Sequence, residues 1–245
     1  MAVLVGFHTE GWDHLILRAF LARLLQWSEE DIAPDWIDAR GCGWDFVLTM
    51  VPRALKRFYG QCAQFAVVGM DNDGNLDLDQ SGVPEDPARP RHWRHPGETN
   101  RRCRYCQVAE TVERTRPDLN YVRCKPGAVW PILICVPVEA IEAWLLAARA
   151  LLTGRPDDLR AENRPHGVRL KQQLYGIPVA TREVVENVAL PLVRAMTDAH
   201  LASLKEYSHS FSDFAEQVDL HLETITGARD CWAPDDRAAE RQLAS

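Results

Sequence analysis

FAVVGMDNDGN, residues 65–75, is an apolar run that ends in two aspartates separated by one residue. Residues 65–70 have the length and the composition of a buried strand, and Asp71 and Asp73 follow it directly. Two carboxylates delivered together at a strand end repel each other unless water solvates them or a cation lies between them. The stretch therefore has two interpretations, a loop with solvated acids and a site for a divalent metal.

Strand-like and helix-like patterns alternate over the first 152 residues. The sequence predicts strands at 2–9, 65–70 and 129–138, and helices at 13–26, 46–59, 106–115 and 139–152. This alternation is typical of right-handed βαβ crossovers and a mainly parallel sheet flanked by helices. Residues 167–226 carry helical patterns, punctuated by Pro178 and Pro191. We therefore expect an α/β domain over 1–153, with a basic Cys/His insertion at 74–126, and a helical subdomain over 154–245.

The composition is that of an ordinary globular protein without membrane-spanning segments. The 245 residues carry a net charge of −7 and contain no run of 18 apolar residues, so no transmembrane helix is expected. The seven cysteines are odd in number and scattered along the chain, which does not indicate a secreted disulfide framework. These features predict a cytoplasmic protein with reduced thiols and no membrane partner.

Basic residues are concentrated in the middle of this acidic chain. Residues 87–126 contain ten Arg or Lys residues and four acids, a local net charge of +6. A basic surface on an acidic body can bind phosphates. The candidate nucleic-acid contacts are Arg94, Arg101, Arg102 and Arg104. The alternative is a solvated polar insertion without a ligand.

Acidic residues follow all three predicted strands. Ligands bind beyond the carboxyl ends of strands in an open α/β sheet, and the acids expected at this edge are Glu10, Asp71, Asp73, Glu139 and Glu142. Each acid, taken alone, could be a solvated surface residue and not a metal ligand. Glu139 could also simply interact favourably with the N-terminus of its helix. Together they form a set of oxygen ligands that suits Mg²⁺ or Mn²⁺. An EF-hand is excluded because Leu76 stands at the sixth loop position, which requires glycine.

Two histidines and two cysteines in the basic segment have paired spacing. His92 and His95 form an H-x2-H pair, and Cys103 and Cys106 form a C-x2-C pair. Two such pairs could bind one structural Zn²⁺ tetrahedrally, with Cys124 or Cys42 as a substitute for one histidine. The loop between the pairs is shorter than in common zinc fingers. An arginine-rich loop with two reduced thiols is the alternative.

The acidic motifs resemble those of the Toprim fold, which topoisomerases, bacterial primases, RecR-type recombination proteins and nucleases of the OLD and ribonuclease M5 types share. The resemblance rests on Glu10, Gly11 and Asp13 after the first strand, on Asp71 and Asp73 after the second, and on PVEAIEAWLLA at 137–147. The last segment is similar to one in small bacterial Toprim-like proteins associated with antiphage defence. The resemblance implies that Glu10 is a general acid/base or metal ligand and that Asp71 and Asp73 bind Mg²⁺. It implies Glu142, or Glu139, as a further ligand.

Hydrolysis of a phosphodiester is the reaction that this resemblance favours. The chain has no recognisable nucleotide-binding module of a primase and no tyrosine-bearing breakage domain of a topoisomerase. A Toprim-type nuclease acting on DNA or RNA, plausible as the effector of an antiphage system, is therefore the leading hypothesis. A partner ATPase is implied by the family alone, since the chain has no G-x4-GK[ST] loop. The rival hypothesis is a non-catalytic module that binds nucleic acid or a protein partner.

Overall fold

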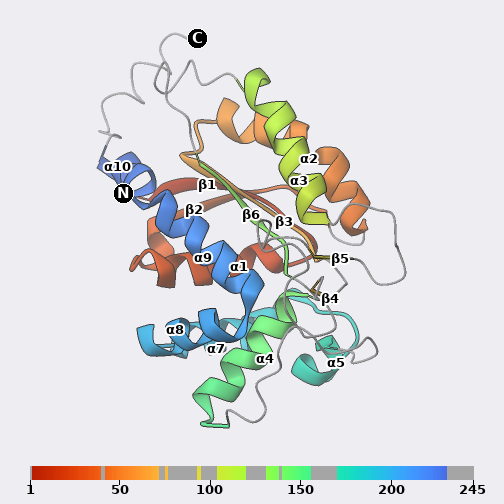
Figure 1. Ribbon diagram of the computed structural model, residues 1–245, viewed down its shortest axis with the longest axis vertical. Helices are drawn as coiled ribbons and strands as arrows, with labels where there is room; N and C mark the ends of the chain where they lie inside the picture. The colour runs from red at the N-terminus through yellow and green to blue at the C-terminus, as the bar shows by residue number, and fades with distance from the viewer. Residues whose placement is uncertain are drawn as a thin grey trace.

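A four-stranded parallel sheet forms the centre of the molecule (Figure 1). The computed structural model describes residues 2–39, 42–71, 75–76, 93–94, 104–119, 131–137, 140–155 and 170–230. Within these residues the strands of the sheet are β1 (Val3–His8), β2 (Ile32–Trp36), β3 (Phe65–Gly69) and β6 (Ile132–Cys135). Their spatial order is β2-β1-β3-β6. A separate antiparallel pair joins β4 (Asn75–Leu76) to β5 (Trp93–Arg94).

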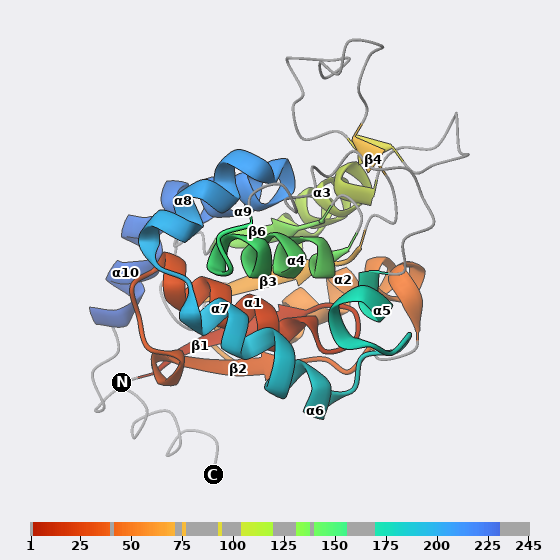
Figure 2. The same cartoon turned by 90° about the horizontal axis from the view of Figure 1, so that it is seen from below.

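Helices cover both faces of the sheet (Figures 1 and 2). One face is covered by α2 (Gly43–Gly60) and α3 (Arg104–Thr115). The other face is covered by α1 (Asp13–Leu24), α4 (Ile141–Leu152), α7 (Leu190–Ala195), α8 (Asp198–Tyr207), α9 (His209–Leu220) and α10 (Leu222–Asp230). The remaining elements are α5 (Leu170–Tyr175), α6 (Arg182–Val184), η5 (Val185–Ala189) and the short turns η1 (Glu29–Asp31) and η2 (Arg116–Asp118).

The strands are apolar on both sides because both faces are buried. Along β3, Phe65 and Val67 belong to the cluster under α1 and α4, whereas Ala66 and Val68 belong to the cluster under α2 and α3. This is the period-2 alternation of a strand, and a sheet covered on both faces explains why its strands read as continuous apolar runs. Gly6 in β1 is required by close packing, since a Cβ there would lie 2.3 Å from the Phe58 ring of α2.

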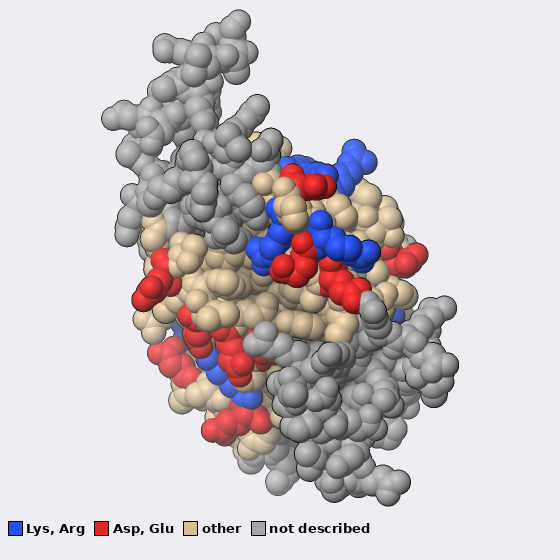
Figure 3. Space-filling view, turned by 45° about the horizontal axis from the view of Figure 1, so that its top comes forward, with Lys and Arg blue, Asp and Glu red and all other residues tan. Residues whose placement is uncertain are grey.

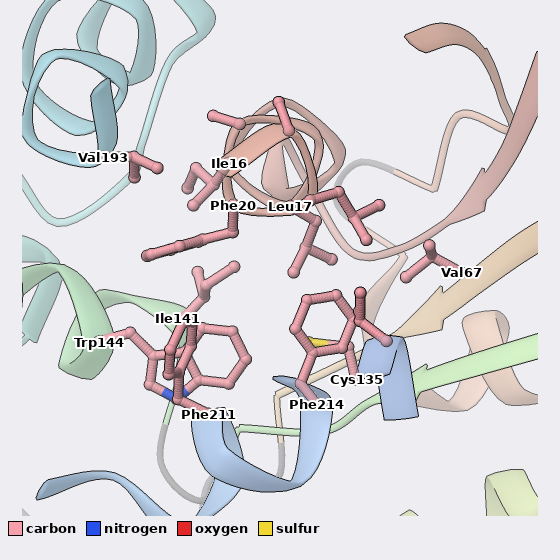
Figure 4. Packing of buried hydrophobic residues seen from close by; sticks show 14 of the residues in the cluster. Ile16, Leu17, Phe20, Val67, Cys135, Ile141, Trp144, Val193, Phe211 and Phe214 are labelled. Atoms are coloured by element: carbon pink, nitrogen blue, oxygen red, sulfur yellow. The ribbon is translucent and has the colours of Figure 1, made fainter. Parts of the chain in front are cut away.

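The C-terminal helices share their hydrophobic core with the sheet. Trp144 of α4 packs edge-on against Phe20 of α1 and Phe211 of α9, with ring centroids 5.9 and 5.2 Å apart (Figure 4). The side-chain amide of Gln217 bonds both the backbone N–H and the carbonyl of Ile134 in β6, each at 2.8 Å. Residues beyond 154 therefore complete one face of the α/β core.

The structure confirms the predicted α/β class, with a parallel sheet between helices and a helical C-terminal part. It adds β2, which the sequence does not reveal because IAPDW contains Pro34 and has no clear alternation. Proline is tolerated there because β2 lies at the edge of the described sheet. Pro191 does not separate two helices as expected. It lies inside one continuous helical run of α6, η5 and α7, directly after the π-helical segment η5, where the hydrogen bonds already depart from the α-helical pattern.

None of the described helices has the length and apolar character needed to cross a membrane.

Candidate active site at the carboxyl edge of the sheet

The chain order reverses between β1 and β3, and the candidate site lies at their carboxyl ends. From β1, the chain first adds β2 on one side and then β3 on the other, so a topological switch point falls between β1 and β3. The two strands are in register, with His8 opposite Val68. Open α/β sheets bind their ligands in the crevice outside the strands at such a point. The topology therefore selects this edge independently of the acids.

Glu10 is positioned by a tight turn between β1 and α1. Gly11 has a φ of +51°, a left-handed conformation that glycine adopts without steric penalty. The backbone N–H of Asp13 donates to the carbonyl of Glu10 at 3.2 Å, which closes the turn. Glu10, Trp12 and Asp13 consequently line the same cavity.

Asp71 is buried two residues beyond β3 and joins three elements. Its Oδ1 accepts a hydrogen bond of 3.1 Å from the backbone N–H of Ile141, the first residue of α4. The first N–H groups of a helix have no partner within the helix, so a carboxylate there is favourable. The Arg104 guanidinium from α3 donates to the carbonyl of Asp71. Asp71 thus fixes the end of β3 to the start of α4.

Glu142 lies in the first turn of α4 with a side chain only 1 % exposed. Its Oε1 is 3.8 Å from the Nζ of Lys171 in α5. One turn further along α5, Tyr175 lines the same space, and its hydroxyl is buried without a hydrogen-bond partner among the described residues. A segment distant in sequence from the sheet therefore supplies a cation and a phenol to the site.

These residues surround a cavity of about 630 Å³, which we call the acidic cavity. Its charged lining residues are Glu10, Asp13, Asp71, Glu142, Lys171 and Arg182. Four acids face two bases, so the lining has an excess of negative charge. Trp12, Pro178, Val179, Ala180 and Val185 provide an apolar part of the wall.

The negative field of the cavity shifts the pKa values of its neighbours. Burial is the largest cause of the raised pKa of Asp13, and the charges of Asp71 and Glu142 raise it further. Burial lowers the pKa of Lys171, but the combined acids, Glu142 foremost, outweigh burial and leave that pKa above its ordinary value. Burial and the same acids raise the pKa of Tyr175. An additional cation would therefore be stabilised in the cavity.

The donor set has the chemistry of a magnesium site, although its described members line the cavity without forming a compact group. Carboxylate oxygens are the ligands that Mg²⁺ and Mn²⁺ prefer. Among the described residues, no three His, Cys, Asp or Glu side chains are grouped closely enough to hold an ion. Glu10, Asp71 and Glu142 do line one cavity, as the sequence predicts. Asp73 and Glu139, the other two predicted ligands, lie outside the described residues.

Most of the predicted zinc and phosphate ligands also lie outside the described residues. These are His92, His95, Cys103, Arg101 and Arg102. Cys106 is a partly buried cysteine of α3. Arg94 is described through the backbone pairing of β5 with β4. The zinc site consequently stays a prediction.

Arg104, expected among the phosphate contacts, is instead only 4 % exposed. Its guanidinium carbon lies 4.4 Å from the centroid of the Trp44 ring, and the group donates to Asp71. Blue and red side chains lie next to one another on the face shown in Figure 3. Lys56 of α2 pairs with Asp118, and Arg116 pairs with Glu113. The contacts of Arg104 therefore support the backbone at the site.

Comparisons of the chain with models of protein families, with curated proteins and with solved structures found no match.

Sequence reasoning gave no site role to Trp12, Tyr175 or Asp13, although Asp13 belongs to the Toprim-like motif, and it did not include Lys171 among the predicted ligands. Asp13 closes the motif that begins with Glu10 and Gly11, and this motif was a usable signal. Lys171 and Tyr175 share one face of α5 by their i, i+4 spacing. No pattern in the sequence shows that α5 lies against the carboxyl edge of the sheet.

Proposed function

We propose that the chain is a metal-dependent phosphodiester hydrolase, a nuclease acting on DNA or RNA at the acidic cavity. The observation that supports this function best is the convergence of Glu10, Asp71 and Glu142, from β1, β3 and α4, on one cavity at the topological switch point. Buried carboxylates are rarely gathered without a counter-ion or a chemical role. The short Toprim-like motifs of the sequence favour the same reaction.

The protein residues divide into ligands, an acid/base and counter-charges. Asp71 and Glu142 would hold Mg²⁺ or Mn²⁺ together with Asp73. When bound, the metal supplies charge neutralisation at a phosphodiester and lowers the pKa of an attacking water. Glu10 orients that water and takes its proton, as a general base within hydrogen-bond reach must. Lys171 and Arg182 supply positive charge to the phosphate oxygens.

The partner and the cellular role extend the same proposal. A cytoplasmic effector in antiphage defence would be restrained until its target is present, and a separate ATPase could provide that control. The chain contains no G-x4-GK[ST] loop of its own.

One contact favours a second candidate function, a non-catalytic module that binds a nucleic acid or a protein partner. Lys171 already provides an ammonium group 3.8 Å from Glu142. The acidic cavity could accept basic side chains of a partner in the same way. The two candidates differ in whether a divalent metal is required and in whether a bond is broken.

Asp71→Asn separates these functions with little change in the fold. Asparagine keeps the oxygen that accepts from the N–H of Ile141, so the start of α4 stays fixed while a charged ligand is lost. Single- and double-stranded DNA, RNA and tRNA should be tested with Mg²⁺ and with Mn²⁺, in the presence and absence of candidate ATPases. We expect the wild type to cut at least one substrate and Asp71→Asn to lose at least about 100-fold in rate.

The matched control is Asp118→Asn, which removes an exposed aspartate paired with Lys56 at 3.0 Å. Its rate should equal that of the wild type. If no substrate is cut under any of these conditions, or if Asp71→Asn cuts as fast as the wild type, the binding module becomes the better account.

A further inference from the structure

The acidic cavity is lined by two different kinds of surface. One part carries the carboxylates together with Lys171, and another part is apolar, with Trp12, Pro178 and Val179. Val179 is 70 % exposed, so its side chain is accessible to a ligand in the cavity. A nucleotide complements both kinds of lining when a divalent cation lies between its phosphate and the carboxylates and its base lies against the apolar residues.

Trp12 is held in place by an aromatic cluster. Its ring centroid lies 6.0 Å from that of His14 and 6.2 Å from that of Trp36. His14 and Trp36 stack on each other at 4.5 Å with their planes only 8° apart. His14 is buried, so the cluster is anchored in the core at the junction of β2 and α1. An indole fixed in this way loses little conformational entropy when a ligand stacks on it.

We propose that Trp12 is a stacking platform for an unstacked nucleobase, and that the protein selects single-stranded nucleic acid over duplex. This inference rests on the proposed function, because hydrolysis places a phosphodiester beside Glu10, and Trp12 follows Glu10 by two residues. The base attached to that phosphodiester then lies against the apolar wall. Stacking on an aromatic side chain tolerates all four bases, since each has a π-face.

The size of the cavity agrees with one nucleotide unit. Its volume of about 630 Å³ is within the range of pockets that enclose small ligands. Within a duplex each base is already stacked on both sides, so its faces are not available to Trp12. A duplex would have to extrude the base first, at a cost of a few kcal/mol. Single strands avoid this cost.

The hydroxyl of Tyr175 is a second indication of a ligand. It is buried beside the cavity with no hydrogen-bond partner among the described residues, although buried hydroxyls are nearly always bonded. A bound nucleotide, whose sugar and base carry acceptors, offers that hydrogen bond.

Binding can be measured without cleavage by fluorescence anisotropy with Ca²⁺ in place of Mg²⁺, with the oligonucleotides checked on a gel afterwards. Four labelled probes are compared: single-stranded DNA, single-stranded RNA, an abasic single strand of equal length, and duplex DNA. The wild type should bind a base-containing single strand roughly 5- to 150-fold more tightly than the abasic strand. A mononucleotide competitor shows whether a free nucleotide is the preferred source of the base.

Variants at Trp12 then test the platform. Trp12→Phe keeps an aromatic ring and should retain the preference for bases, whereas Trp12→Leu keeps an apolar side chain and should remove most of it. Tyr207→Leu is the matched control, because Tyr207 is 41 % exposed and does not line the cavity. It should bind like the wild type.

Equal affinity for the base-containing and abasic strands, equal affinity for duplex and single strand, or no binding to any probe would overturn the inference. Failure of the proposed function gives a different result. Base-dependent binding without cleavage in Mg²⁺ or Mn²⁺ supports the stacking role of Trp12 and contradicts the hydrolase. Equally fast cleavage of abasic and base-containing strands supports the hydrolase and contradicts the stacking role.

Discussion

The acidic cavity and a second cavity beside it contain similar residues but balance their charges differently. The second cavity, of about 280 Å³, is lined by Leu15, Arg18, Glu29, Arg182, Glu186, Leu190 and Arg194, and we call it the arginine–glutamate cavity. Arg194 makes a bidentate contact to Glu29 at 2.6 and 2.8 Å, and Arg182 pairs with Glu186 at 2.7 Å. Each of its acids therefore has an arginine partner.

The acidic cavity has no such balance, since four carboxylates share two lining cations there. The two cavities touch, because Arg182 lines both. Paired charges need no further ligand, whereas an excess of buried negative charge is stabilised by a cation. The comparison favours the proposed ligand-binding role for the first cluster and a structural role for the second, which joins α1, η1 and α7.

Removing one charge from each cluster by the same substitution is the strongest way to break this comparison. Glu142→Gln in the acidic cavity should reduce hydrolysis at least about 100-fold, because it removes a proposed metal ligand. Glu29→Gln in the arginine–glutamate cavity should leave the rate unchanged, because Glu29 and its partner Arg194 do not line the acidic cavity. The measurement is the rate of hydrolysis of the best substrate with Mg²⁺ for each variant and the wild type. Equal reductions of this rate in both variants would contradict a functional difference between the cavities.

Divalent metal should stabilise the protein through the acidic cavity alone. At a Mg²⁺ or Mn²⁺ concentration 100-fold above its dissociation constant, linkage adds about 2.7 kcal/mol to the free energy of unfolding. Thermal denaturation with and without metal measures this effect. Asp71→Asn should lose the shift and Glu29→Gln should keep it. A metal-induced shift that survives in Asp71→Asn would place the ion elsewhere.

The pH dependence of stability should reveal the excess negative charge. Folded Asp13 keeps its proton to a higher pH than unfolded Asp13, because burial and the neighbouring acids raise its pKa. Its ionisation therefore reduces stability as pH rises from about 3.9, the ordinary aspartate pKa, through the raised value. Each unit of that rise costs about 1.4 kcal/mol above the folded pKa.

Asp13→Asn should consequently be more stable than the wild type at neutral pH and equally stable at pH 3 in metal-free buffer. Chemical denaturation at both pH values measures the difference. Asp198→Asn, at an exposed aspartate of α8, is the control and should change little. Lower stability of Asp13→Asn at neutral pH would show that the cavity is not overcharged.

The smallest effect is expected from the balanced cluster. Arg194→Ala should reduce stability by no more than about 1 kcal/mol, because the arginine side chain is 53 % exposed and water screens the pair. The hydrogen bond from Arg194 is the main cause of the lowered pKa of Glu29, although burial opposes it. That contribution is present above about pH 4.3, the ordinary glutamate pKa, and is lost as pH falls through the lowered value. Urea denaturation of the wild type and of Arg194→Ala at pH 7 and pH 3 measures the difference in their free energies of unfolding. If this difference is as large at pH 3 as at pH 7, the variant has lost packing and not a charge interaction.

The sequence by itself determined three of the four described sheet strands, the helices that flank them and the acids that follow the strands. Apolar runs such as 65–69 and the helical periodicity of 141–152 are local signals, because burial of a strand or of a helix face imposes them on neighbouring residues. The sequence did not predict the edge strand β2, because β2 lacks such a local pattern. It pairs with β1 among the described strands and tolerates Pro34, so its sequence carries little of the usual pattern.

Only the tertiary structure decided which residues share the acidic cavity. Glu10 and Asp71 are brought together by the neighbouring positions of β1 and β3, which depend on crossovers that span the intervening helices. Lys171 and Tyr175 reach the site because α5 packs against α4. Strand order and helix docking arise from long-range burial of apolar surface, which leaves no periodic pattern near the residues that it places. The chemistry of the acids could thus be read locally, whereas the counter-charge and the aromatic wall beside them could not.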